Sequence, residues 1–176
     1  MSVQIIIIIG HTGAGKTTLA QALGKKYGLS VLSFHDAGKE LASTENGSLR
    51  FNEIASYLYE GIVSAANTNK PVIADGLAVA GVVERLIASE YAVKTIYLDT
   101  PYELRIERIR QRHFWSAEAA ENIERSKADG KDKGGIASVI GMADVVFNGS
   151  RQVVEVAADF DLWYSTIREG KEEACG

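Results

Sequence analysis

The sequence predicts an α/β fold with three layers, in which a five-stranded parallel sheet lies between two layers of helices and carries a small helical lid. Two observations predict this fold. Short β-branched runs alternate with helical segments along the whole chain, a pattern that calls for right-handed crossovers. A glycine-rich loop joins the first of these runs to the first helix. Because no repeat and no long linker divides the 176 residues, we expect a single domain, 1–176, with a lid at about 112–135.

The run Val3–Ile9 is almost entirely β-branched, which predicts a central strand buried on both faces of the sheet. Further short apolar runs predict strands over 30–34, 71–74, 93–98 and 143–147. Apolar spacing of helical period predicts helices up to about residue 27, over 49–68 and 79–90, from 102, from 117, and over 151–169. The charged, glycine-rich segment 129–135 predicts a mobile loop.

Composition narrows the class of function. The net charge of −4 argues against binding to nucleic acid or to an anionic membrane, because those surfaces require a positive excess. The single cysteine, Cys175, excludes an intrachain disulfide and a cysteine-based zinc site, and it fits a reducing compartment. The first apolar run is much too short to cross a bilayer. We therefore expect a cytoplasmic protein whose ligands are small molecules.

The loop Gly10–Thr18 fits the phosphate-loop pattern G-x-x-x-x-G-K-[ST] at every fixed position. Its glycines let backbone N–H groups turn toward a phosphate, which the N-terminus of the following helix also attracts. In this pattern Lys16 reaches the β- and γ-phosphates and the Thr17 hydroxyl ligates Mg²⁺. The sequence thus predicts a P-loop NTPase fold that binds a nucleoside triphosphate with Mg²⁺, which we take to be ATP although the loop does not specify the base. The predicted ATP-binding residues of the loop are His11, Thr12, Gly13, Ala14, Gly15, Lys16, Thr17 and Thr18.

Ligands of parallel α/β sheets collect beyond the carboxyl ends of the strands, where this chain places two acids. We expect Asp36, after the second strand, to be catalytic and to bind the acceptor, either by taking a proton or by holding a hydroxyl. Asp75 and Gly76, after the third strand, are expected to bind the acceptor, and Asp75 alternatively holds a water of the metal. The alternative for either acid is a helix N-cap. Asn148, after the fifth strand, is expected near ATP.

Three arginines share one face of the predicted helix that begins at Tyr102. Arg105, Arg108 and Arg112 lie at positions i, i+3 and i+7. Guanidinium groups suit the negative charge that spreads over a phosphoryl group during transfer. We expect Arg108 and Arg112 to be catalytic, with Arg108 also binding ATP, and Arg105 to bind the acceptor.

These residues resemble the P-loop nucleotide and small-molecule kinases, a group that includes adenylate, cytidylate and dephospho-coenzyme A kinases. The resemblance implies a lid whose R-x-x-x-R pair, here Arg108 and Arg112, touches the phosphates. The segments 116–120 and 141–150 are most similar to dephospho-coenzyme A kinase, which implies that Asp36 is the base on a substrate hydroxyl. That family's lid-helix arginine and glutamine are replaced here by Asn122 and Ser126, and Arg125 is a candidate substitute for the arginine. The Asp75–Gly76 pair instead looks like cytidylate-type kinases.

The expected function is therefore an ATP- and Mg²⁺-dependent phosphotransferase that moves the γ-phosphoryl group to a nucleotide-like small molecule. A nucleoside monophosphate such as CMP or AMP and dephospho-coenzyme A both remain open as acceptors. One alternative is a kinase of a small sugar or of a shikimate-like acid. An alternative of another class is a regulatory nucleotide-binding switch without an acceptor, although the guanine motif N-K-x-D is missing. The sequence leaves the oligomeric state open.

Overall fold

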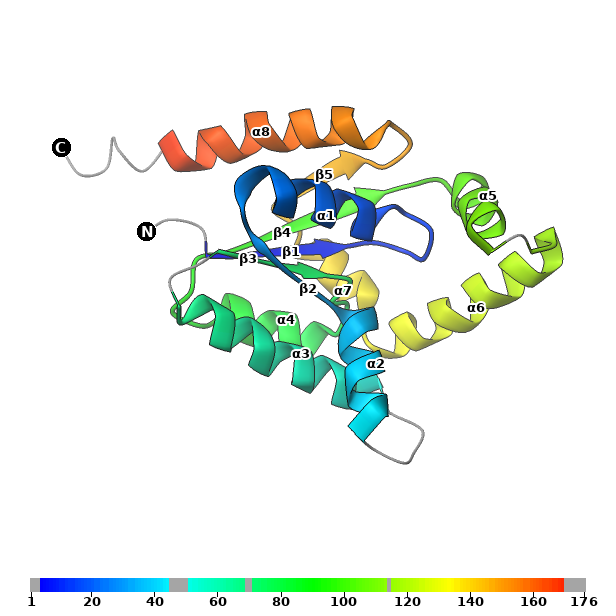
Figure 1. The fold of residues 1–176 in the computed structure, drawn as a ribbon, viewed down its shortest axis with the longest axis horizontal. Helices are drawn as coiled ribbons and strands as arrows, with labels where there is room; N and C mark the ends of the chain where they lie inside the picture. Colours follow the sequence, from blue (N-terminus) through cyan, green and yellow to red (C-terminus); the bar gives the residue numbers. More distant parts are fainter. Residues whose placement is uncertain (1–3, 45–50, 69–70, 114, 170–176) are drawn as a thin grey trace.

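The computed structural model describes residues 4–44, 51–68, 71–113 and 115–169. Within these ranges the chain forms a five-stranded sheet in the order β2-β3-β1-β4-β5, and every paired neighbour is parallel. The α/β prediction with a five-stranded parallel sheet is confirmed (Figure 1). The strands are β1 (Ile5–Ile9), β2 (Ser30–Ser33), β3 (Val72–Asp75), β4 (Val93–Asp99) and β5 (Val145–Asn148).

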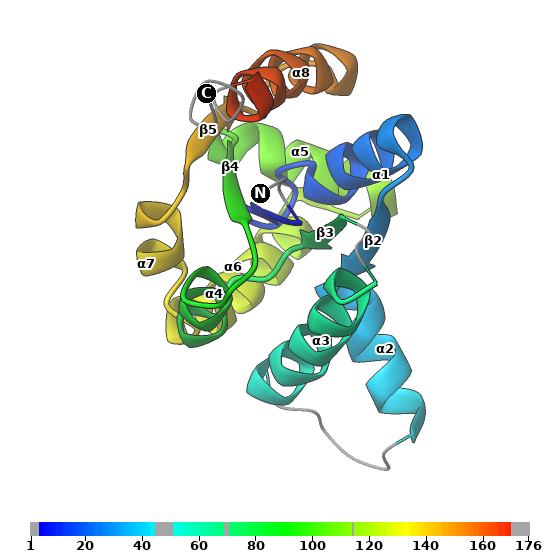
Figure 2. The ribbon, with the colours of Figure 1, turned by 90° about the vertical axis from the view of Figure 1, so that its left-hand side faces the viewer.

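Helices cover both faces of the sheet and also extend beyond the carboxyl ends of the strands. In Figure 2, α1 and α8 lie on one side of the sheet, and α3, α4 and α7 lie on the other. Figure 1 shows α5 and α6 projecting from the end of the sheet at which β1 and β4 finish. The helices are α1 (Lys16–Tyr27), α2 (Phe34–Thr44), α3 (Phe51–Ala66), α4 (Ala80–Ile87), α5 (Tyr102–His113), α6 (Ala117–Lys133), α7 (Ile136–Gly141) and α8 (Val153–Glu169).

The isoleucine run of β1 supplies both halves of the core. Ile5, Ile7 and Ile9 pack into the cluster under α3 and α4, whereas Ile6 and Ile8 pack under α1 and α8. All five side chains are 0% exposed. Because successive strand residues point to opposite faces, a central strand covered on both sides has no place for a polar side chain. This burial anchors the strand from whose end the phosphate loop emerges.

Helices α1 and α8 are joined by aromatic packing and by one polar contact. Tyr27 of α1 meets the Phe160 ring edge-on at a centroid distance of 5.6 Å, and Phe160 also packs against Trp163. At the margin of this cluster Lys26 and Tyr27 both donate hydrogen bonds to the Asp161 carboxylate. These hydrogen bonds from Lys26 and Tyr27, together with the Lys26 charge, lower the pKa of Asp161 from its ordinary value.

Two local predictions are wrong. Residue 34 was expected to end the second strand, but Phe34 begins α2, because the Ser33 hydroxyl accepts the Asp36 N–H at 3.0 Å and caps the helix there. The segment 129–135 was expected to be a loop, but α6 continues to Lys133. Its start is fixed by Ser116, whose hydroxyl accepts the Ala119 N–H, and fully buried Ala120 packs it on α5. Tertiary packing offsets the cost of one internal glycine, about 1 kcal/mol.

The remaining boundaries agree with the predictions to within a few residues. Helix α7 was not predicted, and a helix in the place of α2 was considered only as the alternative in which Asp36 is a cap. Val3 of the first predicted strand and residues 49–50 of the second predicted helix lie outside the described residues. Among the described helices, none combines the length and the apolar character needed to span a membrane.

Candidate active site

The phosphate loop leaves β1 at Gly10 and turns through left-handed backbone at Gly13 and Gly15, with φ of 80° and 99°. Residues with a side chain rarely adopt these backbone angles, so glycine is required at both turns. Lys16 begins α1, and its Nζ donates to the His11 carbonyl at 2.8 Å. The lysine ammonium therefore folds back over the loop, in the place where the pattern predicts phosphate contacts.

Thr17 and Asp75 meet beside the loop. Asp75 ends β3, which pairs with β1 in parallel and sets Ile8 opposite Asp75. The Thr17 hydroxyl donates to Asp75 Oδ2 at 2.6 Å, and the Asp75 side chain is buried, at 3% exposed. The two oxygen groups come from adjacent elements and fit a magnesium ion, which takes few protein oxygens and completes its shell with phosphate and water. Within the described residues, no group of three or more His, Cys, Asp or Glu side chains is placed to hold a metal.

Gly76 follows Asp75 with φ of 80°, and its N–H donates to the Ile8 carbonyl at 2.9 Å. A Cβ atom at this position would lie 3.8 Å from Lys16 Cε and 3.7 Å from Phe34 Cβ. Gly76 thus lies between the phosphate loop and the start of α2. This is the region in which the sequence predicts the acceptor.

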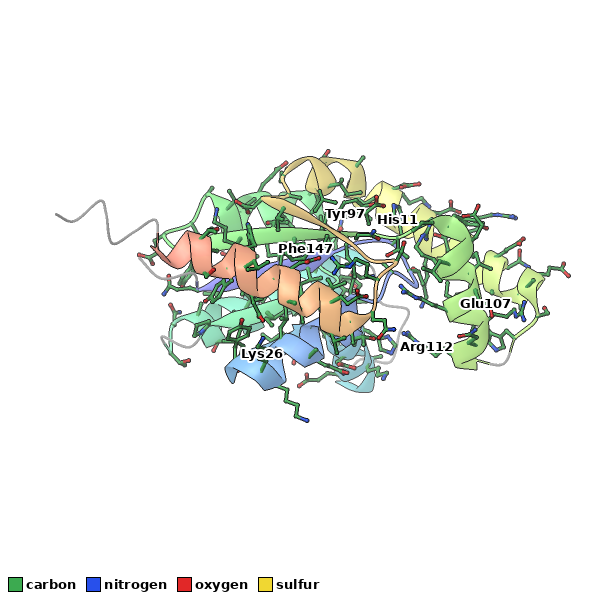
Figure 3. The ribbon with its side chains drawn as sticks, turned by 90° about the horizontal axis from the view of Figure 1, so that it is seen from above. His11, Lys26, Tyr97, Glu107, Arg112 and Phe147 are labelled. Carbon is green, nitrogen blue, oxygen red and sulfur yellow. The ribbon has the colours of Figure 1, made fainter. Side chains whose placement is uncertain are left out.

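A cavity of 580 Å³ opens on the other side of the loop. Arg108 and Arg112 reach it from α5, and the turn between β5 and α8 closes its far wall. Arg108 is half-buried and its Nη1 donates to the Ala14 carbonyl at 3.2 Å, whereas Arg112 is exposed. Figure 3 shows Arg112 on the side of α5 that faces α8. The lining residues are Gly13, Ala14, Gly15, Thr18, Leu19, Leu98, Arg108, Gln111, Arg112, Gly149, Arg151, Gln152, Val153 and Val156.

Arg105 has a different environment from the other two arginines. Its side chain is buried, its Nε donates to the Thr100 carbonyl at 3.2 Å, and its Nη1 donates to the Thr12 carbonyl at 3.3 Å. The same guanidinium pairs with Glu124 of α6. Arg105 was expected to bind the acceptor, and the structure places it against the backbone of the phosphate loop.

Asp36 lies in the first turn of α2 with a side chain that is 72% exposed. The Ser33 hydroxyl donates to Asp36 Oδ2 at 2.9 Å, and Lys39 Nζ lies 3.7 Å from Oδ1. Ser33 is therefore the residue that caps α2, and the Asp36 carboxylate is a further acceptor in that turn. Among the residues that the structure describes, the polar contacts of Asp36 are with Ser33 and Lys39 and not with the phosphate loop.

The end of β4 contributes residues that the sequence did not single out. The Thr100 hydroxyl donates to the Ala14 carbonyl at 3.1 Å, and the Gly149 N–H donates to the Asp99 carbonyl at 2.6 Å. A Cβ atom on Gly149 would lie 2.0 Å from Thr100 Oγ1, so only glycine fits. Burial and the neighbouring Asp99 carboxylate raise the pKa of Tyr97, whose hydroxyl donates to Asp99 at 3.4 Å.

The predicted site residue Asn148 lies one position before Gly149. Its side chain is exposed, and its Oδ1 accepts the Ser150 N–H at 2.9 Å. The structure therefore brings Gly149, rather than Asn148, to the cavity wall. The sequence signal for this was the glycine itself, directly after a strand end.

The protein family of the chain follows from a match to a family model. Residues 6–129 match the family model AAA_18, described as an AAA domain. The chain belongs to this family. A search of curated protein sequences finds no significant match.

Solved structures with the same fold cover nearly the whole chain. An uncharacterised protein from Eubacterium ventriosum ATCC 27560 is 18% identical, with 92% of this chain and 97% of that chain covered and a TM-score of 0.67. A gluconokinase from Sinorhizobium meliloti 1021 is 12% identical, with 98% of each chain covered and a TM-score of 0.65. A shikimate kinase from Acinetobacter baumannii, solved in complex with shikimate, is 20% identical, with 93% and 94% covered and a TM-score of 0.62.

These similarities fix the fold. The predicted three-layer fold of the P-loop kinase group is confirmed, because the chain belongs to the matched family and shares its fold with the kinases named above.

Proposed function

We propose that the chain transfers the γ-phosphoryl group of ATP, with Mg²⁺, to a hydroxyl group of a small acceptor bound between the phosphate loop and α2. The observation that carries this proposal is the contact between Thr17 and Asp75. A hydroxyl of the loop and a buried carboxylate, 2.6 Å apart, supply the oxygen groups that a Mg²⁺·nucleotide complex needs. A bound Mg²⁺ would neutralise charge on the β- and γ-phosphates.

Side chains of the loop and of α5 bind the phosphates and stabilise the group that is transferred. The ammonium of Lys16 leaves the His11 carbonyl and takes the β- and γ-phosphate oxygens as partners, because a charged acceptor makes the stronger hydrogen bond. Arg108 and Arg112 approach from α5 and stabilise the negative charge of the transferring group. With ATP bound, the lid expected at about 112–135 closes over the site and excludes water, which would otherwise accept the phosphoryl group.

Asp36 is the group proposed to orient the acceptor and to take its proton. A hydroxyl acceptor loses its proton when it receives the phosphoryl group, so a nearby carboxylate can take that proton as a general base. The phosphate of a nucleoside monophosphate is already an anion, and it would call for cations. Lys39 is the cation within 4 Å of Asp36 in the part of the chain that the structure describes. This contrast favours a hydroxyl acceptor, which includes dephospho-coenzyme A, small sugars and hydroxy acids, over CMP or AMP.

Both hydroxyl classes have support. The segments 116–120 and 141–150 are similar to dephospho-coenzyme A kinase, whereas the solved structures of the same fold include a gluconokinase and a shikimate kinase. The test is ADP release from Mg²⁺·ATP across a panel of dephospho-coenzyme A, gluconate, shikimate, small polyols, CMP and AMP. Lys16→Ala is the negative control, because it should abolish transfer while the thermal midpoint is retained.

The outcomes separate the candidates. Stimulation by a hydroxyl acceptor, with the acceptor phosphorylated in a stoichiometric amount, supports the proposal. Stimulation by CMP or AMP alone contradicts the hydroxyl class and returns the function to a nucleoside monophosphate kinase. Mg²⁺·ATP binding with no acceptor-dependent turnover contradicts the transfer reaction and favours the nucleotide switch.

A further inference from the structure

We propose that Arg105 is a positioning residue that fixes one peptide of the phosphate loop, and that Glu124 of α6 holds Arg105 in place. The pair then links the second helix of the α5–α6 hairpin to the backbone that binds phosphate. The activity readout below rests on the proposed function, whereas the nucleotide-affinity readout does not.

Arg105 is buried and takes part in a network of polar contacts. Arg105 is 8% exposed and Glu124 is 7% exposed. The guanidinium contacts three separate elements: the Thr100 carbonyl at the end of β4, the Thr12 carbonyl in the phosphate loop and the Glu124 carboxylate. An unpaired buried charge is costly, so a buried arginine with three acceptors is held in one position. These three contacts use the Nε and Nη1 donors of Arg105.

The contact with Thr12 controls the direction of an N–H group. A trans peptide is planar, so the Thr12 carbonyl and the Gly13 N–H lie in one plane and point in opposite directions. While Arg105 holds the carbonyl, the Gly13 N–H points away from α5, where it is available to a phosphate. The approach is close, because a Cβ atom on Gly13 would lie 2.5 Å from the Arg105 carbonyl oxygen.

A second peptide of the loop is held in the same way. The Ala14 carbonyl accepts hydrogen bonds from Thr100 Oγ1 and from Arg108 Nη1, which directs the Gly15 N–H away from both. Arg105 and Arg108 lie three positions apart on one face of α5, so each arginine holds one peptide of the loop. Arg108 belongs to the catalytic set, whereas Arg105 acts through the backbone.

Glu124 determines where the guanidinium of Arg105 lies. It is carried by α6, which packs on α5 through Ala120, Ile106 and Ile109. The far end of α6 is also fixed, because the Gly134 carbonyl accepts the Ala80 N–H of α4 at 2.8 Å. The half of α6 from Glu124 to Lys133 is therefore anchored at both ends.

The experiment compares three variants with the wild-type protein. Arg105→Met combined with Glu124→Leu removes both charges and keeps the volume, a replacement that buried ion pairs often tolerate without loss of stability. Arg105→Lys keeps the charge opposite Glu124 but cannot reach Thr12 and Thr100 together. Arg110→Met is the matched control, because Arg110 is an exposed arginine of the same helix, paired with Glu107 at 3.3 Å. The readouts are the Kd of Mg²⁺·ADP by calorimetry, kcat and KM for ATP, and the thermal midpoint.

We expect the double variant and Arg105→Lys to fold, to bind Mg²⁺·ADP about tenfold or more weakly and to lose about tenfold or more in kcat. Arg110→Met should match the wild type in both. A double variant or an Arg105→Lys protein that keeps its thermal midpoint, and whose Kd and kcat stay within about twofold of wild type, would overturn the proposal. If the double variant does not fold, Arg105→Lys decides the matter. A wild-type protein that binds Mg²⁺·ADP but phosphorylates no acceptor contradicts the proposed function. In that case the Kd values of the variants for Mg²⁺·ADP still test the role of Arg105.

Discussion

The Thr17 hydroxyl lies 2.6 Å from the Asp75 carboxylate, although the two residues are 58 positions apart in the chain. The contact exists because β1 and β3 are parallel neighbours, so the strand that leads into the phosphate loop and the strand that ends in Asp75 finish side by side. A sheet in which β1 and β3 were not neighbours would separate the loop from this acid. The candidate magnesium site is thus a direct product of the topology.

The first prediction concerns Asp75. Asp75→Asn keeps the shape of the side chain and the acceptor for Thr17, but removes the negative charge that would attract Mg²⁺ or orient its water. We expect kcat to fall by about a hundredfold or more and the Mg²⁺ concentration for half-maximal rate to rise. A magnesium titration at saturating ATP measures both.

Thr17 offers the matched pair for that experiment. Thr17→Ser keeps the hydroxyl and should retain most of the activity, whereas Thr17→Ala removes it and should resemble Asp75→Asn in its demand for Mg²⁺. If Asp75→Asn leaves the magnesium dependence unchanged, Asp75 serves the acceptor or the structure and does not serve the metal.

The second prediction separates catalysis from helix capping at Asp36. Asp36→Asn should lower kcat more than it raises the KM for the acceptor, because a base is used only in the transition state. The Ser33 hydroxyl is the cap, so Ser33→Ala should cost about 1 kcal/mol of stability with a smaller effect on kcat. Steady-state kinetics and thermal unfolding of both variants give the comparison. An Asp36→Asn protein with wild-type kcat and reduced stability would make Asp36 part of the cap.

Much of this arrangement follows from local sequence. Five consecutive isoleucines in β1 predict a strand that is covered on both faces. The glycines of the loop from Gly10 to Thr18 predict its turns, and its motif predicts a phosphate ligand. The spacing of Arg105, Arg108 and Arg112 places all three on the side of α5 that faces the loop. Such features depend on a few neighbouring residues, so they can be predicted without knowledge of the remaining chain.

The features that could not be predicted depend on partners distant in sequence. Helical spacing places Arg105 and Arg108 on the same face of α5, but of the two only Arg105 pairs with a buried glutamate. In the sequence, Glu124 looks like any exposed acid of a charged helix. Residues 129–133 have the composition of a loop and become helix because α6 packs on α5. Gly149 is required by the Thr100 side chain, which belongs to another strand end. Long-range packing decides each of these cases.

The third prediction tests that packing at Gly149. Gly149→Ala places a methyl group 2.0 Å from Thr100 Oγ1 and 2.9 Å from the Asp99 carbonyl, so the turn or the end of β4 must shift. Because Thr100 also holds the Ala14 carbonyl, we expect weaker nucleotide binding and a loss of stability of about 1–3 kcal/mol. Chemical unfolding and Mg²⁺·ADP affinity measure the two effects.

The control for that substitution is Gly81→Ala. Gly81 lies in α4, where an added Cβ atom meets no heavy atom within 4 Å. Alanine is the better helix former, so this variant should gain about 0.5–1 kcal/mol in stability and bind nucleotide as the wild type does. Equal behaviour of the two alanine variants would show that the Gly149 turn is not tightly packed.

The last prediction concerns the pH dependence of stability and the contact of α1 with α8. Hydrogen bonds from Lys26 and Tyr27 lower the pKa of Asp161 in the folded protein from 3.8. A carboxyl whose pKa is lower when folded stabilises the protein above its unfolded pKa, and this contribution is lost as the pH falls through the folded pKa. Asp161→Asn should therefore lower the thermal midpoint by about 1–3 °C at pH 7, since the pair is partly exposed.

The difference between Asp161→Asn and wild type should shrink as the pH falls from about 4 and vanish below the folded pKa. Thermal midpoints measured from neutral to acidic pH follow this loss, and Glu90→Gln, which removes an exposed acid after α4, is the control. Added salt should reduce the neutral-pH difference, because the Lys26 charge is accessible to counterions. A difference that stays constant from pH 7 to the acid limit would mean that Asp161 stabilises the helix contact through packing and not through its charge.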